Sequence, residues 1–269
     1  LALSLIASAL SSAAMTSLFS VSGAVVTPLP QAHAHNDYRH QRPLFDALDH
    51  GFCSVEADIF LVNGLLLVGH DVDELQSERT LQSLYLEPLR RRISKNKGSV
   101  HSSASDFHLM IDIKSESKST FKALSRLLAD YRDVITPANA GPGRRNGVRI
   151  VVSGNRDHDL IAADKERLAG IDGRLSDLDS TLPTTVMPWI SDNWTKHFKW
   201  NGSGAMPPDE RRKLREIVGR AHRSGRRIRF WKTPETKAAW RELAEADVDF
   251  INTDKLAELA AFLLRLRQK

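Results

Sequence analysis

Acidic and basic side chains recur at two-residue spacing in two apolar runs of this chain. Glu56 and Asp58 stand in one run, and Asp112 and Lys114 stand at the end of another. Residues two apart on a β-strand point to the same face, so each pair shares one face. Two adjacent carboxylates that face inward repel each other and are costly to bury without compensation. A divalent cation resolves this conflict, and the hard oxygen ligands of Glu56 and Asp58 suit Mg²⁺ or Ca²⁺.

Two histidines stand close to these acidic residues in the sequence. His35 lies at the end of the first β-like run, and His70 follows a short apolar run after Asp58. Imidazole has an unperturbed pKa of about 6.5, so it can take or give a proton near neutral pH. His33 shares a face with His35 on a strand, which makes it a candidate supporting residue. These residue types predict acid/base chemistry beside a cation.

Each of these residues alone is weak support for a site. A single strand carboxylate is usually solvated or salt-bridged, and a single histidine such as His70 is more often a surface or capping residue. A strand whose polar face meets water would bury Val55, Ala57 and Ile59 instead of the carboxylates. The combination of three carboxylates, two histidines and Lys114 is what favours a functional site.

Short β-like runs alternate with helix-like amphipathic runs along the chain. Candidate strands are 31–36, 53–60, 65–68, 107–113, 148–153, 184–190, 227–231 and 249–252. Candidate helices are 43–50, 80–93, 118–132, 158–169, 208–224, 234–246 and 256–267. The alternation favours parallel βαβ units, and about seven or eight of them fit a TIM-type (β/α)8 barrel, an α/β fold. Reactive residues of such a barrel lie at the C-terminal ends of its strands, where the candidate residues fall.

The 269 residues allow one large domain or two small ones, and no linker divides them. Residues 1–24 are uncharged and rich in apolar and small residues, which is typical of a signal peptide. An uncleaved membrane anchor is the alternative, but serines dilute the apolar run. We therefore expect a protein exported to the periplasm or the exterior, with residues 25–269 as a single barrel domain.

Composition excludes several classes of protein. The chain is 41% hydrophobic and 26% charged, which excludes disorder, and its single cysteine excludes a disulfide framework. The net charge of +5 suits an anionic substrate but falls short of a dedicated nucleic-acid binder. Residues 209–232 hold ten Lys/Arg against three acidic residues. This stretch predicts a solvated helix face or, alternatively, a weak contact with an anionic membrane surface.

The order of the candidate residues resembles that of the PLC-like phosphodiesterase superfamily, which includes glycerophosphodiester phosphodiesterases and spider-type sphingomyelinase D. That order is His35, Glu56-x-Asp58, His70-Asp71 and Asp112-x-Lys114. The stretches HAHNDYRHQRPLFDALDHGFCSVEADIFLVNGLLLVGHD, FKWNGSGAMPPDERRKL and DFINTDKL look closest to one subgroup. Its eukaryotic members are called altered-inheritance-of-mitochondria proteins. The resemblance covers roughly residues 31–262.

The resemblance implies a role for each matching residue. The implied acid/base pair is His35 and His70, the implied ligands of one divalent metal are Glu56, Asp58 and Asp112, and the implied phosphate and pocket contacts are Lys114 and Trp231. Asn36 and Asn155 are further candidates for polar contact with the substrate. The usual glycerophosphodiesterase opening, His-Arg-Gly followed by Glu-Asn-Thr, is absent, and Asp112 stands where glutamate is common. These departures bear on the headgroup of the substrate, not on the phosphodiesterase machinery.

The residues and the resemblance together predict an exported, metal-dependent phosphoric diester hydrolase. Its expected substrate is a glycerophosphodiester or a (lyso)phospholipid-type molecule, cleaved by histidine acid/base catalysis with a cyclic phosphate as a candidate intermediate. A lyase that releases the cyclic phosphate and a non-catalytic barrel that binds a polyanion are the alternatives. Trp189 and Trp200 bound an aromatic stretch that forms either a lid or a packed loop.

Overall fold

A computed structural model describes residues 26–101, 105–140 and 147–268, so the predicted signal peptide, residues 1–24, lies outside the described residues. The strands in the described ranges are β1 (Leu29–Ala34), β2 (Phe52–Val62), β3 (Leu65–Val68), β4 (Phe107–Ile113), β5 (Val148–Gly154), β6 (Ala169–Gly173), β7 (Trp189–Asn193), β8 (Arg227–Trp231) and β9 (Phe250–Thr253). All except β3 run parallel and close into a barrel in the order β1-β2-β4-β5-β6-β7-β8-β9, because β1 pairs with both β9 and β2. β3 pairs antiparallel with β2 outside the ring. The predicted TIM-type α/β barrel is confirmed.

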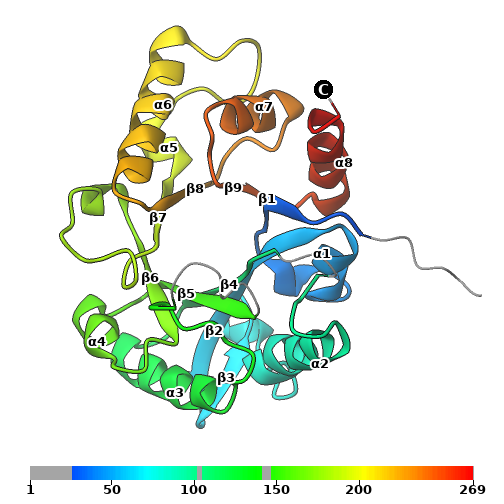
Figure 1. Cartoon of the computed structure of the whole chain (residues 1–269), viewed down its shortest axis with the longest axis vertical. Coiled ribbons are helices and arrows are strands. Elements are labelled where there is room, and N and C mark those ends of the chain that lie inside the picture. The colour runs from blue at the N-terminus through cyan, green and yellow to red at the C-terminus, as the bar shows by residue number, and fades with distance from the viewer. Residues whose placement is uncertain (1–25, 102–104, 141–146, 269) are drawn as a thin grey trace, which may run out of the picture.

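Helices cover the outside of the barrel. They are α1 (Phe45–Asp49), α2 (Glu87–Lys95), α3 (Ser117–Ala129), α4 (His158–Ala163), α5 (Trp194–His197), α6 (Pro208–Arg223), α7 (Lys237–Glu245) and α8 (Leu256–Leu266). α6, α7 and α8 lie on one side of the strands, and α2, α3 and α4 lie on the other (Figure 1). Within the described residues, none of these helices has the length and apolar character needed to cross a membrane.

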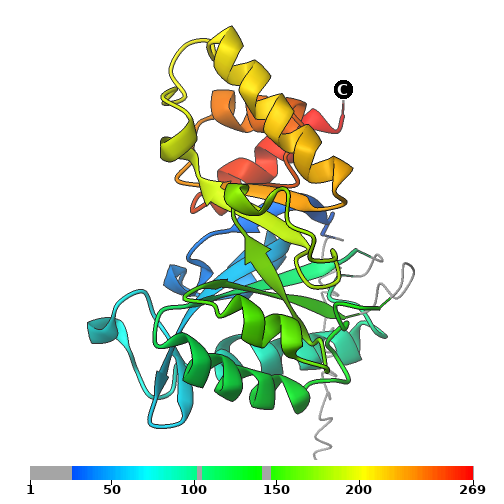
Figure 2. The same cartoon turned by 90° about the vertical axis from the view of Figure 1, so that its left-hand side faces the viewer.

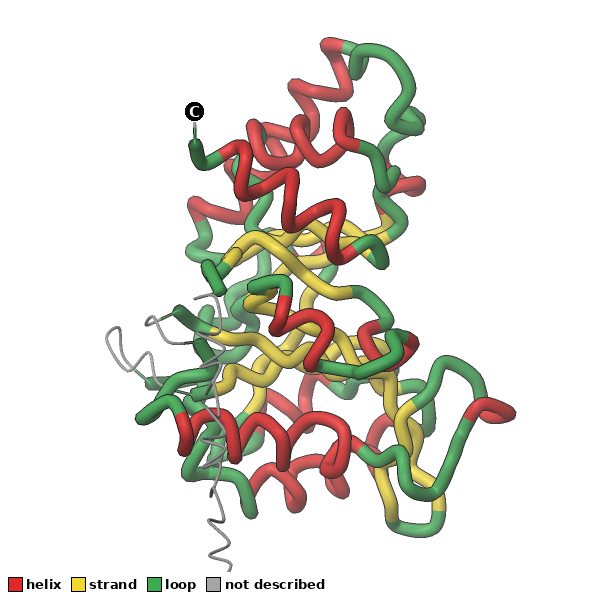
Figure 3. The backbone as a smooth tube through the Cα atoms, turned by 90° about the vertical axis from the view of Figure 1, so that its right-hand side faces the viewer, coloured by secondary structure: helices red, strands yellow, loops and turns green. Residues whose placement is uncertain are grey.

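The loop after β3 extends away from the body of the barrel. It carries the short turn η2 (Val72–Glu74), which projects to the left in Figure 2 and to the right in Figure 3. This loop also carries His70, one of the predicted catalytic residues.

Barrel strands bury both of their faces, as β2 shows. Val55 and Ile59 belong to the main apolar core, whereas Glu56 and Asp58 alternate with them and face the barrel interior. Both sets are buried, since Val55 and Ile59 are 0% exposed and Glu56 and Asp58 are 5% and 1% exposed. The alternative in which the carboxylates face water is therefore excluded.

Side chains fill the interior of the barrel. Met110, Val151, Trp189 and Phe250 form a small apolar cluster separate from the main core. The rings of Trp189 and Phe250 stack with centroids 3.9 Å apart. Layers of this kind are the normal filling of a TIM-type barrel, which has no pore. The cluster separates the two ends of the barrel, so each end has a cavity of its own.

Strand β6 is missed by the sequence patterns. The periodicity predicts a helix over 158–169, but α4 ends at Ala163 and β6 begins at Ala169. β6 reads Ala-Gly-Ile-Asp-Gly, so it lacks the β-branched run that usually marks a strand. Close packing requires its glycines, because a Cβ on Gly170 would lie 2.7 Å from Pro188. Eight strands are predicted and eight parallel strands form the barrel, but the two sets differ by one member. The predicted strand 65–68 pairs antiparallel with β2 outside the ring, and β6 takes its place in the barrel.

The aromatic stretch from Trp189 to Trp200 is packed and does not form a lid. β7 begins at Trp189, where the sequence predicts a strand over 184–190, and Trp189 therefore lies inside the barrel. The rings of Trp194 and Phe198 stack at 4.1 Å, and Nε1 of Trp194 donates to the carbonyl of Trp200 at 3.1 Å. All of these aromatic side chains are buried.

Much of the basic stretch 209–232 pairs within the fold. Arg211 and Arg220 form ion pairs with Glu242 and Asp179. Arg226 is buried and donates to three backbone carbonyls. Contact with an anionic membrane surface therefore stays a prediction. Fewer basic side chains are unpaired, and so available for such a contact, than the sequence suggests.

Candidate active site

A cavity of about 440 Å³ opens at the C-terminal ends of the barrel strands. All the residues predicted to be catalytic, to hold the metal or to contact the substrate line it: His35, Asn36, Glu56, Asp58, His70, Asp112, Lys114, Asn155 and Trp231. They lie on six different strands or on the segments that follow these strands. Parallel strands of a closed barrel all end at the same rim, which is why residues so distant in sequence meet there. The volume falls in the range of about 300–1,000 Å³ that is usual for small-molecule sites.

Three carboxylates converge at the floor of this cavity. Glu56, Asp58 and Asp112 each place one oxygen within 4.8 Å of the others. Oδ1 of Asp58 is buried without a hydrogen bond from any described residue, whereas its Oδ2 accepts one from Tyr38 at 2.7 Å. Burial and the charges of Glu56 and Asp112 raise the pKa of Asp58 to about 7. Burial and the charge of Glu56 also raise the pKa of Asp112. An unpaired oxygen among crowded carboxylates fits a hard divalent cation.

Lys114 partly balances this negative charge. Its Nζ lies 3.0 Å from Oδ2 of Asp58 and 3.1 Å from Oδ1 of Asp112. Burial lowers the pKa of Lys114, but the charges of the two carboxylates outweigh burial and raise the pKa overall. The ammonium group of Lys114 is therefore charged and lies beside the carboxylates. An anionic group that binds a cation held by these carboxylates would also lie within reach of Lys114.

Glu56 is held ionised by an arginine that the sequence patterns do not single out. Its Oε2 accepts from Nη2 of Arg229 at 2.6 Å and lies 3.2 Å from Nε2 of His33. Burial raises the pKa of Glu56, but the charge of Arg229 and the bond to His33 outweigh it and lower the pKa overall. Burial and the charge of Arg229 lower the pKa of His33 to about 3, so His33 is neutral. In the sequence, the only sign that the side chain of Arg229 points into the barrel is its alternation with the apolar residues Ile228 and Phe230.

Gly154 allows β5 to approach the carboxylates closely. Its φ is +70°, and a Cβ there would lie 2.2 Å from Oδ1 of Asp112 and 2.4 Å from the carbonyl oxygen of Ile113. Glycine adopts this left-handed conformation without a steric penalty. The space beside Asp112 therefore depends on Gly154.

His35 lies directly after β1 and pairs with Asp254, a residue that follows β9. Nδ1 of His35 is 2.8 Å from Oδ1 of Asp254. Burial lowers the pKa of His35, but the bond to Asp254 and the charge of Glu56 raise the pKa overall. With Nδ1 bonded to a carboxylate, Nε2 is the nitrogen left for proton transfer. The sequence patterns do not single out Asp254, although its position directly after a barrel strand is one where site residues are expected.

His70 has the same arrangement on another loop. Its Nδ1 lies 2.8 Å from Oδ2 of Asp71, and its backbone N–H donates to Glu74 at 3.0 Å. The bond to His70 lowers the pKa of Asp71. Both cavity histidines are thus oriented by a carboxylate at Nδ1, which leaves Nε2 available in each.

Asn36 and Asn155 line the cavity and also hold its loops in place. Asn36 adopts a left-handed backbone with φ 47°, and its Oδ1 accepts from Tyr38 at 2.8 Å. Its Nδ2 lies 3.0 Å from Nδ1 of His35. Nδ2 of Asn155 donates to the carbonyl of Lys114 at 3.0 Å. These contacts assign both asparagines a positioning role, and their contact with a substrate stays a prediction.

Trp231 stands at the end of β8, four strands from β4 in either direction around the ring. The guanidinium carbon of Arg174, which follows β6, lies 4.8 Å from the centroid of the Trp231 ring. Arg174 and Lys232 both line the cavity. The side of the cavity formed by Arg174, Trp231 and Lys232 is therefore basic and aromatic.

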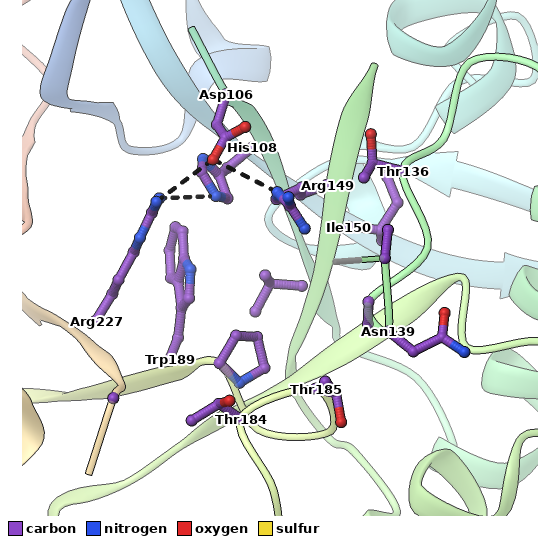
Figure 4. Close-up of a pocket in the computed structure, with 15 residues that line it drawn as sticks. Asp106, His108, Thr136, Asn139, Arg149, Ile150, Thr184, Thr185, Trp189 and Arg227 are labelled. Carbon is purple, nitrogen blue, oxygen red and sulfur yellow. Dashed lines mark hydrogen bonds and ion pairs between the residues drawn. The ribbon is translucent and has the colours of Figure 1, made fainter. Parts of the chain in front are cut away.

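A second cavity, of about 380 Å³, opens at the N-terminal end of the barrel. Figure 4 shows Asp106 between Arg149 and Arg227, with an ion pair of 3.5 Å to each. Nη1 of Arg227 lies 3.0 Å from Nε2 of His108. Burial and the charge of Arg227 lower the pKa of His108 well below its usual value, so this histidine is neutral. Trp189 forms part of the wall of this cavity.

The fold and the C-terminal cavity together define a parallel barrel of the phosphodiesterase type, with an acidic cluster flanked by two carboxylate-held histidines. Residues 22–169 match the AIM6-like phosphodiesterase domain, and residues 227–257 match the glycerophosphoryl diester phosphodiesterase family. The first match covers more than half of the chain. The chain therefore belongs to the AIM6-like phosphodiesterase domain family, which confirms the resemblance found in the sequence.

Curated relatives and solved structures agree with this assignment. The chain is 27% identical to the altered inheritance of mitochondria protein 6 homolog of Arthroderma benhamiae, over 85% of this chain and 82% of that protein. It is 29% identical to altered inheritance of mitochondria protein 6 of Eremothecium gossypii, over 88% of this chain and 70% of that protein. A glycerophosphodiester phosphodiesterase structure from Agrobacterium tumefaciens shares the fold, with a TM-score of 0.52, 18% identity, and coverage of 87% of this chain and 99% of that one.

Proposed function

We propose that this protein is a metal-dependent phosphodiesterase that cleaves a glycerophosphodiester or a related (lyso)phospholipid-type substrate by histidine acid/base catalysis. The observation that carries the proposal is the convergence of the carboxylate cluster and both carboxylate-held histidines on one cavity. The family assignment supports a phosphodiester as the bond that is cleaved. Export is part of the proposal and rests on the sequence of residues 1–24 alone.

A phosphodiester carries one negative charge, which repels an attacking oxygen. Glu56, Asp58 and Asp112 would hold a divalent cation, which when bound neutralises charge on the phosphoryl oxygens. Lys114 adds a second positive charge at the same place, within ion-pair distance of two of these carboxylates. Arg229 keeps Glu56 ionised and so keeps the cluster able to bind a cation.

Two histidines are required because one oxygen must lose a proton and another must gain one. We assign His35 as the base, because the bond to Asp254 raises its pKa and fixes Nε2 as the accepting nitrogen. His70, oriented by Asp71, then gives a proton to the leaving oxygen. The attacking oxygen is a hydroxyl of the substrate, which gives a cyclic phosphate, or a water molecule, which gives a monoester directly.

The test is a turnover assay on a defined panel. Glycerophosphocholine, glycerophosphoethanolamine, lysophosphatidylcholine and bis(p-nitrophenyl) phosphate are incubated with the protein and Mg²⁺, Ca²⁺ or EDTA, and products are followed by phosphorus NMR. We expect a phosphomonoester that forms only with a divalent metal. A lasting cyclic phosphate without monoester would instead show a lyase, and no metal-dependent turnover of any compound would favour the polyanion-binding barrel.

A matched control variant tests whether the loss of activity is specific to His35. Nε2 of His222 on α6 lies 2.8 Å from Oδ2 of Asp249, so this histidine also pairs with a carboxylate but lies outside the C-terminal cavity. His35→Ala should abolish most of the turnover, whereas His222→Ala should leave it unchanged. Equal loss in both variants would count against the assignment of His35.

A further inference from the structure

The basic side of the C-terminal cavity has charge that the proposed reaction does not use. Of the cationic side chains that line the cavity, Lys114 contacts the carboxylate cluster and Arg229 bonds to Glu56. Arg174 and Lys232 remain. Arg174 forms an ion pair with the buried Asp172 and contacts neither the carboxylate cluster nor Glu56, and it lies against the ring of Trp231, the residue before Lys232. A substrate bound by its phosphodiester at the carboxylate cluster would extend its attached group toward this side.

Arg174 is fixed in orientation but keeps a free donor. Its Nη1 donates to Oδ2 of the buried Asp172 at 2.9 Å and to the carbonyl of Gly173 at 3.0 Å. Asp172 in turn accepts from Ser153 at 2.8 Å and from Ser191 at 2.5 Å, so the anchor is itself held on three sides. Nη2 of Arg174 donates to Oγ of Ser153 at 3.3 Å, whereas Nε makes no hydrogen bond with any described residue. A guanidinium that is fixed in this way and keeps an unpaired Nε–H is suited to bind an oxyanion.

Arg156 is a second arginine whose charge interacts with that of Arg174, although it does not line the cavity. Its Nη1 donates to the carbonyl of Gly154, and its buried Nε has no hydrogen-bond partner in the described part of the chain. Burial lowers the pKa of Arg156, and repulsion by the charge of Arg174 acts in the same direction. A negative group bound to Arg174 would relieve that repulsion.

Lys232 completes the basic side at the rim. Its backbone is left-handed with φ 55°, a conformation that residues with a Cβ adopt at a cost. It forms no ion pair with the residues that the structure describes. Backbone strain that places an unpaired cation at a cavity indicates a binding role.

We propose that the substrate carries a second anionic group, a carboxylate or a phosphate, on the moiety attached to the phosphodiester, and that Arg174 and Lys232 bind this group beside Trp231. This inference rests on the proposed function, because it places the scissile phosphodiester at the carboxylate cluster. It defines the substrate as one with at least two anionic groups, which a glycerophosphodiester with a choline or ethanolamine headgroup does not satisfy.

Two matched pairs of substrates test the proposal, one for each source of the anionic group. Glycerophosphoserine differs from glycerophosphoethanolamine by a carboxylate, and glycerophosphoinositol 4-phosphate differs from glycerophosphoinositol by a phosphate. We expect kcat/KM to favour the anionic member by about tenfold or more in at least one pair, the size of one charge-assisted hydrogen bond. The preference is a ratio within one preparation, so a partly folded variant does not distort it.

Variants locate the preference. Arg174→Gln should reduce the ratio to about one, because a glutamine cannot supply the charge. Lys232→Asn should reduce the ratio by roughly threefold, since asparagine tolerates the left-handed backbone and an exposed cation contributes less than a fixed one. Arg149→Gln, which removes the same charge from the opposite end of the barrel, is the control and should leave the ratio unchanged.

The outcomes separate this inference from the proposed function. Turnover with a ratio of about one in both pairs would overturn the inference and leave the phosphodiesterase assignment standing. A preference that survives both Arg174→Gln and Lys232→Asn would also overturn it. If no compound is turned over with Mg²⁺ or Ca²⁺, the proposed function fails, and calorimetric binding of the same pairs decides the inference by the same ratio of affinities.

Discussion

The two ends of the barrel hold cavities of similar size, about 440 and 380 Å³, but they treat charge in opposite ways. At the N-terminal end Asp106 lies between Arg149 and Arg227, and the nearby His108 is neutral. At the C-terminal end carboxylates crowd together until the pKa of Asp58 rises to about 7.

Crowded like charges lower the stability of a fold unless something else binds them. The N-terminal end therefore shows the pattern of a structural ion-pair network. The C-terminal end shows the pattern of a site built for a ligand of opposite charge. Since TIM-type barrels place chemistry at the C-terminal ends of their strands, the contrast supports the cavity of His35 and His70 as the active site.

The largest effect should follow removal of either histidine from the C-terminal cavity. His35→Ala and His70→Ala should each lower kcat by roughly 10²–10⁴-fold with the fold intact, the range for losing general acid/base help. Circular dichroism and thermal melting check the fold, and the phosphodiester assay checks the rate. Wild-type rates in both variants would remove the acid/base assignment.

Removing one carboxylate should come next in size. Asp58→Asn should weaken metal affinity by at least roughly tenfold, since even outer partners of metal ligands commonly contribute about 10–100-fold. Asp58→Asn should also raise the melting temperature of the metal-free protein at pH 8, because it removes one of the mutually repelling negative charges of the carboxylate cluster. A variant that binds metal as well as the wild type would show that Asp58 is not a ligand.

The pH dependence of metal-free stability sharpens the same point. The folded-state pKa of Asp58 lies above its usual value, so stability from this group is present at low pH and is lost as pH rises from 3.8 through about 7. A divalent cation binds the ionised carboxylates and restores stability there. The gain in melting temperature on adding Ca²⁺ should therefore be larger at pH 8 than at pH 5. An equal gain at both values would contradict a carboxylate site.

A smaller effect is expected from the partner of His35. Asp254→Asn should lower kcat/KM by roughly tenfold, less than the loss of the base itself. The bond to Asp254 raises the pKa of His35, so its loss should also shift the acidic limb of the pH–rate profile to lower pH. A limb that stays in place would assign it to another group.

The smallest effect should come from the N-terminal end. Asp106→Asn leaves Arg149 and Arg227 without their shared carboxylate, so the free energy of unfolding should fall by about 0.5–1 kcal/mol, as for partly exposed ion pairs. The value of kcat/KM should change by less than about twofold. Chemical denaturation and the phosphodiester assay measure the two quantities, and a large loss of activity with intact stability would contradict the contrast between the two ends.

The strand periodicity predicts much of the fold and the site, because it is a local property. The phases of β2 and β4 alone show that Glu56, Asp58 and Asp112 point the same way, and the barrel rule then brings them together. Residues whose role depends on a distant partner could not be predicted in this way. Asp254 pairs with His35 across 219 positions, and no local pattern records that contact.

Arg174 could not be predicted as a site residue for a different reason. It follows β6, a short strand with two glycines that the patterns assign to no strand, because the predicted helix over 158–169 ends at its first residue. Because β6 is not predicted as a strand, the sequence offers no reason to place Arg174 at the C-terminal end of the barrel. The glycines themselves are explained only by neighbours far along the chain, such as Met187, which would lie 2.6 Å from a Cβ on Gly173.

The central claim, that three carboxylates share one cation at the C-terminal end, is tested most directly by calorimetric titration of the metal-free protein with Mg²⁺ and Ca²⁺ at pH 8. We predict one ion bound per chain in the wild type and in Asp106→Asn, with binding weakened in Asp58→Asn. No binding in the wild type, or undiminished binding in Asp58→Asn, would contradict the account.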